Sequence, residues 1–300
     1  MNTSCVSGFF EEIDCAGFPQ GELELLSESA NGVFVLYRCQ SGGRYSVLKS
    51  LQPDYRGQSV YEEMLRKEYE IGSALKHPNI REYYAFFEHP LLGNCISMEW
   101  VDGSPLPAGS SLSKASRKRL VLQLLDALAY LHLHQVIHRD IKPENILVTR
   151  NGQNIKLIDF SLADSDSYFI LKASAGTPLY ASPEQQDGKK GDCRSDIYSL
   201  GVILRDFADN KRQLAVAAKC MRPLPGQRFA GVEELRKAFY PSLKNRLLLL
   251  LAALVLLLFG LGFVLTSRLQ EAQSIYQDST IDSIFLQATE LLEQAGDLSD

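Results

Sequence analysis

The chain has 300 residues, of which 45% are hydrophobic and 22% are charged, with a net charge of −5. This composition is that of a folded protein and excludes an intrinsically disordered one, while the charge gives no reason to expect nucleic acid as a partner. The cysteines lack C-x-x-C spacing, so they suggest reduced thiols and neither a zinc site nor a disulfide framework: Cys5, Cys15, Cys39, Cys95, Cys193 and Cys220.

Residues 1–21 form an N-terminal extension without lysine or arginine. Because a secretory signal needs a basic start and an apolar run, we do not expect one here. The elements predicted after it are, in chain order, strands in residues 22–51, a helix in 61–75, strands in 83–88 and 95–100, a long amphipathic helix in 113–132 and a short helix in 232–239. Strands followed by helices indicate an α+β body in two parts.

Residues 247–265 depart from this globular pattern, because they are apolar except for two glycines. As a helix they would span roughly 28 Å, which is close to the thickness of the hydrocarbon core of a bilayer. A buried core helix of this length usually carries a polar stripe, and this run has none. The sequence therefore predicts one transmembrane helix.

The flanks of this run differ in charge and predict its orientation. Arg236, Lys237, Lys244 and Arg246 precede the run, whereas Arg268 is the one basic residue that follows it. The positive-inside rule then makes the preceding body cytosolic and the acidic tail, residues 266–300, extracytoplasmic. Apolar residues of the tail share one face of an amphipathic helix: Ile281, Ile284, Phe285, Ala288, Leu291 and Leu292. The tail could form a homodimer, lie on the bilayer or bind another protein.

The strongest functional pattern is HRDIKPEN at residues 138–145, followed fourteen residues after Asn145 by Asp159. Phosphoryl transfer needs a carboxylate to orient the attacking hydroxyl, a carboxylate and an amide to hold Mg²⁺, and cations to offset phosphate charge. One loop supplies Asp140, Lys142 and Asn145, and a second loop supplies Asp159. In this pattern the chain resembles the eukaryotic-type (Hanks-type) Ser/Thr protein kinase family, over about residues 22–240.

The resemblance implies a bilobal kinase fold, with a small, mainly β N-lobe and hinge in residues 22–101 and a large, mainly α C-lobe in residues 102–243. It implies ATP and Mg²⁺ as cofactors, with Mn²⁺ as a second option. By resemblance, Asp140 would be the catalytic base and Lys142 would contact the transferred phosphate. Asn145 and Asp159 would bind the metal ion.

The N-lobe contains the nucleotide-binding residues that the resemblance implies. Lys49 would hold the α- and β-phosphates and pair with Glu68, which lies nine residues before the HPNI segment that begins at His77.

Residues 98–101 resemble the hinge between the lobes. Backbone groups of Glu99 and Val101 would bind the edge of adenine, and Val47 and Leu147 would sandwich the ring.

Residues 176–184 resemble the end of a kinase activation segment, which small-molecule kinases lack. Glu184 would form a buried ion pair with Arg228, and residues 196–201 would belong to the helix that anchors the catalytic loop. Arg139 is in the position that often accepts a phosphate from this segment. The candidate phosphorylation sites are Ser165, Ser167, Ser174 and Thr177.

Four positions depart from the family pattern. Residues 27–32 read SESANG instead of G-x-G-x-x-G, so only Gly32 remains and weaker use of ATP is expected. Ser161 replaces the glycine of the metal-binding triplet. Gly72 stands where a bulky apolar side chain usually packs, which predicts a loosely docked helix. Residues 205–213 are too few for the additional helix that kinases normally have there.

Two functions remain open. The first is a membrane-anchored protein kinase that transfers the γ-phosphate of ATP to Ser or Thr hydroxyls. The second is a pseudokinase, a nucleotide-binding membrane scaffold. Pseudokinases usually lose at least one of five residues that kinases need for transfer. The presence of all five in this chain favours an active kinase: Lys49, Glu68, Asp140, Asn145 and Asp159.

Overall fold

The computed structural model describes residues 23–28, 32–41, 43–151, 154–163, 179–241 and 243–296. The N-terminal extension, Ser29 to Asn31 of the glycine-poor loop and all four candidate phosphorylation sites lie outside the described residues. The chain divides into two units, Met1–Tyr240 and Pro241–Asp300, which are described separately.

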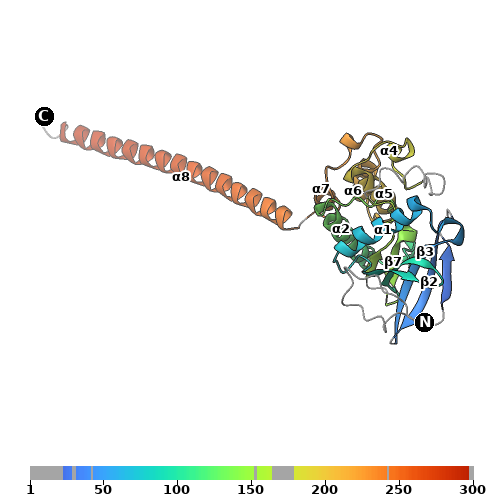
Figure 1. Cartoon of the computed structure of the whole chain (residues 1–300). Coiled ribbons are helices and arrows are strands. Elements are labelled where there is room, and N and C mark those ends of the chain that lie inside the picture. The colour runs from blue at the N-terminus through green and yellow to red at the C-terminus, as the bar shows by residue number, and fades with distance from the viewer. Residues whose placement is uncertain are drawn as a thin grey trace. The chain divides into compact units, whose positions relative to one another are not determined.

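Unit 1 begins with an antiparallel sheet in the strand order β1-β2-β3-β5-β4 (Figure 1). Its strands are β1 (Glu24–Glu28), β2 (Phe34–Ser41), β3 (Arg44–Leu51), β4 (Tyr83–His89) and β5 (Gly93–Glu99). Helix α1 (Ser59–Ala74) packs against β3, β4 and β5. Its buried residues recur at helical spacing, so one face of the helix covers the sheet: Met64, Leu65, Glu68 and Gly72.

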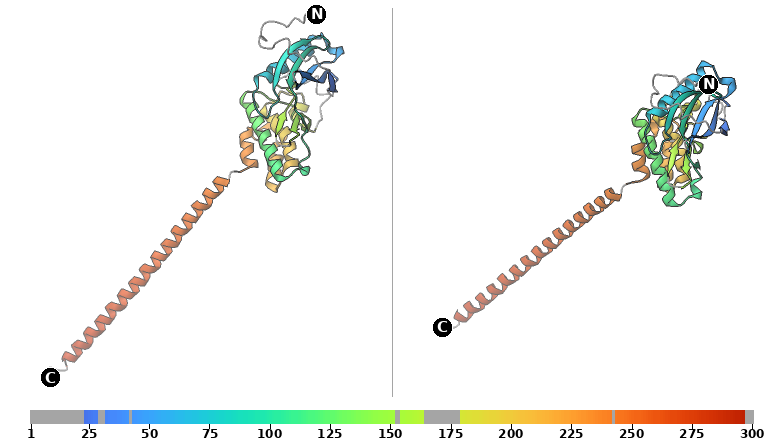
Figure 2. Two further views of the ribbon diagram at one scale, coloured as in Figure 1. Left: turned by 90° about the horizontal axis from the view of Figure 1, so that it is seen from below. Right: turned by 60° about the horizontal axis from the view of Figure 1, so that its bottom comes forward.

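The remainder of unit 1 is mainly helical, as the green to orange segments in Figure 2 show. Its helices are α2 (Lys114–Leu133), α4 (Pro183–Gln186), α5 (Cys193–Phe207), α6 (Lys211–Cys220) and α7 (Val232–Phe239). A small sheet carries the catalytic segments and consists of β6 (Gly103–Pro105), β7 (Ile146–Thr149) and β8 (Ile155–Leu157). The structure thus confirms the α+β, bilobal architecture that the sequence predicts.

Polar side chains fix where the longer helices of this part begin. Ser113 accepts a hydrogen bond from Ser116 N at the start of α2, Asp192 accepts one from Arg194 N at α5, and Asn210 accepts one from Gln213 N at α6. Each cap satisfies a backbone donor that the first turn of a helix leaves without a partner. Helix α6 begins only four residues after α5 ends, so no further helix lies between them.

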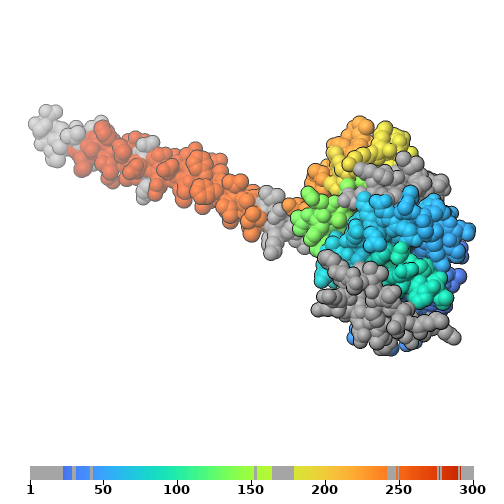
Figure 3. All heavy atoms as spheres, in the orientation of Figure 1, coloured from blue at the N-terminus to red at the C-terminus, as the bar shows by residue number. Residues whose placement is uncertain are grey.

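Unit 2 contains the single long helix α8 (Leu243–Gly296). Its described apolar side chains are exposed, and Figure 3 draws them as spheres along the helix. By length and composition, Leu250–Thr289 is the one described segment that could cross a membrane. The predicted transmembrane run of 247–265 and the predicted tail helix therefore belong to one continuous helix.

Candidate active site

The catalytic loop is held by the buried carboxylate of Asp196, on α5. Its oxygens accept hydrogen bonds from the backbone nitrogens of His138 at 2.9 Å and Arg139 at 2.8 Å. Burial alone would raise the pKa of Asp196, but the hydrogen bond and charge of His132 outweigh it and lower the pKa. The negative charge of Asp196 thus persists in the interior and fixes the backbone just before Asp140.

Two non-glycine residues of the site adopt a left-handed backbone, Arg139 with φ of 64° and Asp159 with φ of 66°. Such conformations are uncommon for residues with a side chain and concentrate at functional sites. Arg139 directly precedes Asp140, and Asp159 is itself a member of the predicted catalytic set. The two left-handed backbone positions therefore lie where the chemistry would take place.

The side chains of Lys142 and Asn145 both contact Asp140. The Lys142 ammonium lies 2.8 Å and 3.0 Å from the two carboxylate oxygens of Asp140. Asn145 Nδ2 donates to the backbone oxygen and to Oδ2 of Asp140, both at 2.8 Å. These contacts orient the Asp140 carboxylate, which keeps 18% of its side-chain surface exposed. A substrate hydroxyl could reach such an oriented and accessible base.

The donor set around Asn145 and Asp159 fits a hard divalent cation. Because Asn145 uses Nδ2 on Asp140, its Oδ1 is the amide atom that is left for a metal ion. Ile158 N donates to Asn145 O at 2.9 Å, which brings the loop of Asp159 next to Asn145. Mg²⁺ prefers such oxygen ligands and usually completes its shell with substrate phosphates. When bound, the ion would neutralise phosphate charge.

Lys49 lies between two carboxylates in the buried part of the site. Its ammonium is 2.8 Å and 2.6 Å from the two oxygens of Glu68 and 3.0 Å from Asp159 Oδ1. Burial would lower the pKa of Lys49, but the charges of Asp159 and Glu68 outweigh it and raise the pKa. The structure thus brings together β3, α1 and the loop of Asp159 through the ammonium of Lys49.

The hinge residues lie at the end of β5 and just beyond it. Glu99 N donates to Glu82 O at 2.8 Å, and the Glu99 carboxylate lies 2.8 Å from the ammonium of Lys156. Val101 is buried. These contacts fix the segment between the lobes.

The residues predicted to contact adenine occupy separate strands. Val47 lies on β3 and is buried, and Leu147 lies on β7 and is partly buried. Gly32 adopts a φ of +67°, and a Cβ atom there would meet no neighbour within 4 Å. The contacts of these residues with a nucleotide stay a prediction.

The structure corrects the expectation that Gly72 leaves α1 loosely docked. A Cβ atom at Gly72 would lie only 2.6 Å from Cδ2 and Cε2 of Tyr83, so the tyrosine ring already fills the space. This contact joins a helix and a strand that are distant in sequence, which is why the helix alone did not predict it. One signal in the sequence could have indicated this contact, namely the combination of a glycine on the helix with a large aromatic residue on β4.

The predicted ion pair at the end of the activation segment is present. Arg228 donates from Nη1 and Nη2 to the two oxygens of Glu184, each at 2.7 Å. Burial raises the pKa of Glu184, but hydrogen bonds led by those from Arg228 outweigh it and lower the pKa to about 2. The bidentate geometry ties α4 to the loop before α7.

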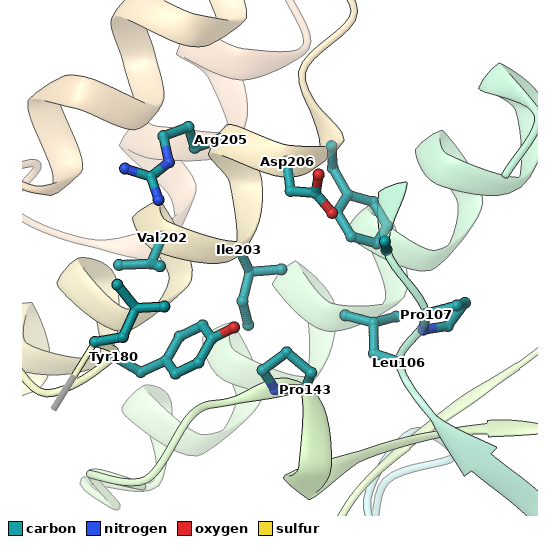
Figure 4. A pocket seen from close by; sticks show the side chains of 11 residues that line it. Leu106, Pro107, Pro143, Tyr180, Val202, Ile203, Arg205 and Asp206 are labelled. Atoms are coloured by element: carbon teal, nitrogen blue, oxygen red, sulfur yellow. The ribbon is translucent and has the colours of Figure 1, made fainter. Parts of the chain in front are cut away.

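A cavity of about 500 Å³ lies next to the catalytic loop, at the end of α5 (Figure 4). Asp206 is held there by a hydrogen bond from Gly109 N at 2.5 Å. The lining residues are Leu106, Pro107, Ala108, Pro143, Leu179, Tyr180, Val202, Ile203, Arg205, Asp206 and Phe207. Most of the lining residues are thus apolar, and the lining includes one basic and one acidic side chain.

Comparisons with known proteins agree with this geometry. Residues 24–221 match the family model of the protein kinase domain. A probable serine/threonine-protein kinase of Streptomyces coelicolor is 36% identical over 55% of this chain and 26% of its own length. The serine/threonine-protein kinase PrkC of Bacillus subtilis is 35% identical over 54% of this chain and 26% of its own length.

The fold has a solved counterpart in the PknI kinase domain of Mycobacterium tuberculosis. That crystal structure has a TM-score of 0.56 and 25% identity, and the match covers 72% of this chain and 93% of the PknI domain. The match to the curated relatives spans only about a quarter of their length. Since the family model covers most of unit 1, the chain belongs to the protein kinase family and resembles its Hanks-type Ser/Thr members.

Proposed function

We propose that the chain is a protein kinase that transfers the γ-phosphate of ATP to Ser or Thr hydroxyls of protein substrates. The observation that carries this proposal is the arrangement of Asp140, Lys142 and Asn145 beside the Lys49–Glu68 ion pair. Protein kinases as a family use ATP and a divalent metal ion.

The residues of the chain would divide the work as follows. Asp140 would accept the proton of the substrate hydroxyl, and Lys142 would offset charge on the transferred phosphate. Lys49 would hold the α- and β-phosphates while Glu68 holds Lys49. Asn145 and Asp159 would hold Mg²⁺ or Mn²⁺.

The kinase assay uses the full chain, purified in mild detergent because α8 exposes a long apolar surface. Transfer of labelled phosphate from ATP to the chain itself and to a basic test protein is measured with Mg²⁺ and with Mn²⁺. Asp140→Asn should reduce the rate about 100-fold or more, because general-base catalysis typically contributes that much. Lys49→Ala should also abolish detectable transfer.

The alternative function is a pseudokinase that binds nucleotide as a membrane scaffold, and the serines and Glu28 of the glycine-poor loop favour it. Nucleotide binding without transfer in the unchanged protein would support that alternative. Transfer at an undiminished rate in Asp140→Asn would point to a contaminating kinase.

Control by phosphorylation of the activation segment is part of the proposal. The backbone of Arg139 is fixed by Asp196 and by Gln185, whose Nε2 donates to Arg139 O at 2.9 Å. An arginine placed beside the catalytic base is suited to hold a phosphate. Mass spectrometry after incubation with ATP should find phosphate on Ser165, Ser167, Ser174 or Thr177, and its absence from all four contradicts this control.

Membrane anchoring through 247–265, with the body cytosolic and the tail extracytoplasmic, completes the proposal. The proposal also includes self-association of the tail into a homodimer. If deletion of residues 266–300 leaves the oligomeric state in detergent unchanged, the homodimer does not form through the tail.

A further inference from the structure

Tyr83 lies at the start of β4, where it faces the helix that carries Glu68. It is buried, and its ring occupies the space that a side chain at Gly72 would fill. The packing of α1 on the sheet thus depends on a residue of the strand. A purely apolar residue could fill this space equally well, so the hydroxyl of Tyr83 requires its own explanation.

The Tyr83 hydroxyl donates a hydrogen bond to Glu68 Oε1 at 3.1 Å. The same oxygen accepts one from Lys49 at 2.8 Å. Burial above all, and then the charge of Glu68, raise the pKa of Tyr83 well above its ordinary value. Tyr83 therefore stays protonated at physiological pH and always offers its proton to the carboxylate.

The Tyr83 ring also contacts the metal-binding loop. Its centroid lies 6.1 Å from that of Phe160 in an edge-to-face arrangement, and Phe160 follows Asp159 in the chain. The Phe160 ring lies 5.0 Å from the ring of His138, at the start of the catalytic loop. One side chain thus touches the helix, the carboxylate partner of Lys49 and the residue next to Asp159.

We propose that Tyr83 is a positioning residue that replaces the missing side chain at Gly72 and aligns Glu68 so that Lys49 is held for the phosphates of ATP. The inference deepens the proposed kinase function and rests on it. Without the hydroxyl, the Glu68 carboxylate can turn, and Lys49 can move to Asp159, which it already contacts at 3.0 Å. Nucleotide binding should then weaken more than the rate of transfer.

The test compares variants of the full chain in detergent. Tyr83→Phe keeps the ring and removes only the hydroxyl. Gly72→Leu/Tyr83→Leu moves the apolar filling from the strand to the helix and also lacks the hydroxyl. Tyr84→Phe is the matched control, because Tyr84 is the next residue of β4 and is 47% exposed. Phe239→Leu, in the core of α7, controls for lost stability alone.

For each protein we would measure the Kd for ATP by displacement of a fluorescent analogue, the KM and kcat of transfer, and the Tm. Tyr83→Phe should raise Kd and KM for ATP about tenfold, which matches the loss of a hydrogen bond to a charged group, and lower kcat less than about threefold. Gly72→Leu/Tyr83→Leu should have the Tm of the unchanged protein, because apolar packing is retained, but it should show the same raised Kd for ATP as Tyr83→Phe. Tyr84→Phe and Phe239→Leu should bind ATP as the unchanged protein does.

Unchanged Kd and KM in Tyr83→Phe, or unchanged ATP binding by Gly72→Leu/Tyr83→Leu, would overturn the proposal, because apolar packing without the hydroxyl would then suffice. If the unchanged protein binds ATP without transfer, the proposed kinase activity fails, and the Kd comparison still decides the role of Tyr83. If the unchanged protein binds no ATP, both proposals fail.

Discussion

Arg81 is a charged residue that is only 7% exposed, in the loop before β4. Its Nη1 donates to the sulfur of Met98 at 3.5 Å, and its Nε has no hydrogen-bond partner among the described residues. Burial lowers the pKa of Arg81. The charges of Asp159, Glu99 and Glu68 offset this effect only in part, so the buried guanidinium costs desolvation free energy that its contacts do not return.

Replacing Arg81 by methionine should therefore stabilise the protein. We expect Arg81→Met to raise the free energy of unfolding by about 1–4 kcal/mol, because methionine has a similar length and no charge to desolvate. Urea denaturation without nucleotide measures the change. Arg212→Met, at an exposed position, should have no effect. A loss of stability in Arg81→Met would mean that the guanidinium has a partner worth more than its desolvation.

The Glu184–Arg228 pair predicts a pH dependence of stability. The pKa of Glu184 in the folded protein, about 2, lies below the ordinary value of 4.5, so the unfolded chain binds the proton more readily. The stabilisation is complete above about pH 4.5 and decreases as the pH falls toward 2. Denaturation midpoints measured across this range should show the decline, and Glu184→Gln should remove the part that this pair contributes.

Removing one partner of this pair should also be costly at neutral pH. The Arg228 side chain is fully buried, and Glu184→Gln would leave its charge without a counter-ion. We expect a loss of about 3–5 kcal/mol in the free energy of unfolding. Ser195→Ala removes a weaker hydrogen bond to the same carboxylate and should cost about 1 kcal/mol. Equal losses in the two variants would argue against a dominant role of the ion pair.

At the scale of elements, α5 and α6 approach each other at Gly201. A Cβ atom there would lie 2.4 Å from Cys220 Cβ, so the absence of a side chain permits the contact. The two helices follow one another closely in sequence, since α6 begins only four residues after α5 ends. Their packing therefore bears directly on the end of α5, where the cavity beside the catalytic loop lies.

Gly201→Ala should destabilise the protein by about 1–3 kcal/mol through overpacking. Helix propensity alone predicts the opposite sign, a gain of about 1 kcal/mol, so the measurement distinguishes the two effects. Gly226→Ala is the control, because a Cβ there meets nothing within 4 Å. Stabilisation by Gly201→Ala, measured by urea denaturation, would show that α5 and α6 are packed more loosely than described.

The sequence predicted those elements that carry their own periodic pattern. The helix expected at 113–132 is α2, and the helix expected at 232–239 is α7 with the same bounds. The catalytic loop was predictable because its residues are consecutive. The contact of Gly72 with Tyr83 and the burial of Arg81 were not, because each depends on which distant segment packs against the residue. Single-sequence patterns contain no information of that kind.

At the scale of the whole molecule, α8 predicts how the chain partitions between membrane and aqueous phase. The full chain should stay with vesicles after an alkaline wash, whereas a fragment of residues 1–240 should remain soluble. Protease added outside should shorten the chain from its C-terminal end and leave the kinase unit intact. Leu256→Arg/Leu258→Arg should weaken insertion, because each arginine near the helix centre costs about 2.5–3.5 kcal/mol. A full chain that is soluble without detergent contradicts the anchor.

The continuity of α8 has a mechanical consequence. Its 54 residues form a rod of roughly 80 Å, more than twice the hydrocarbon thickness of a bilayer. Successive residues of such a rod differ in direction by about 100°, so a contact at its far end sets the rotational phase of its near end. A single inserted residue beyond Arg268 would turn everything that follows by that angle. Information could thus pass along α8 as torsion about its axis.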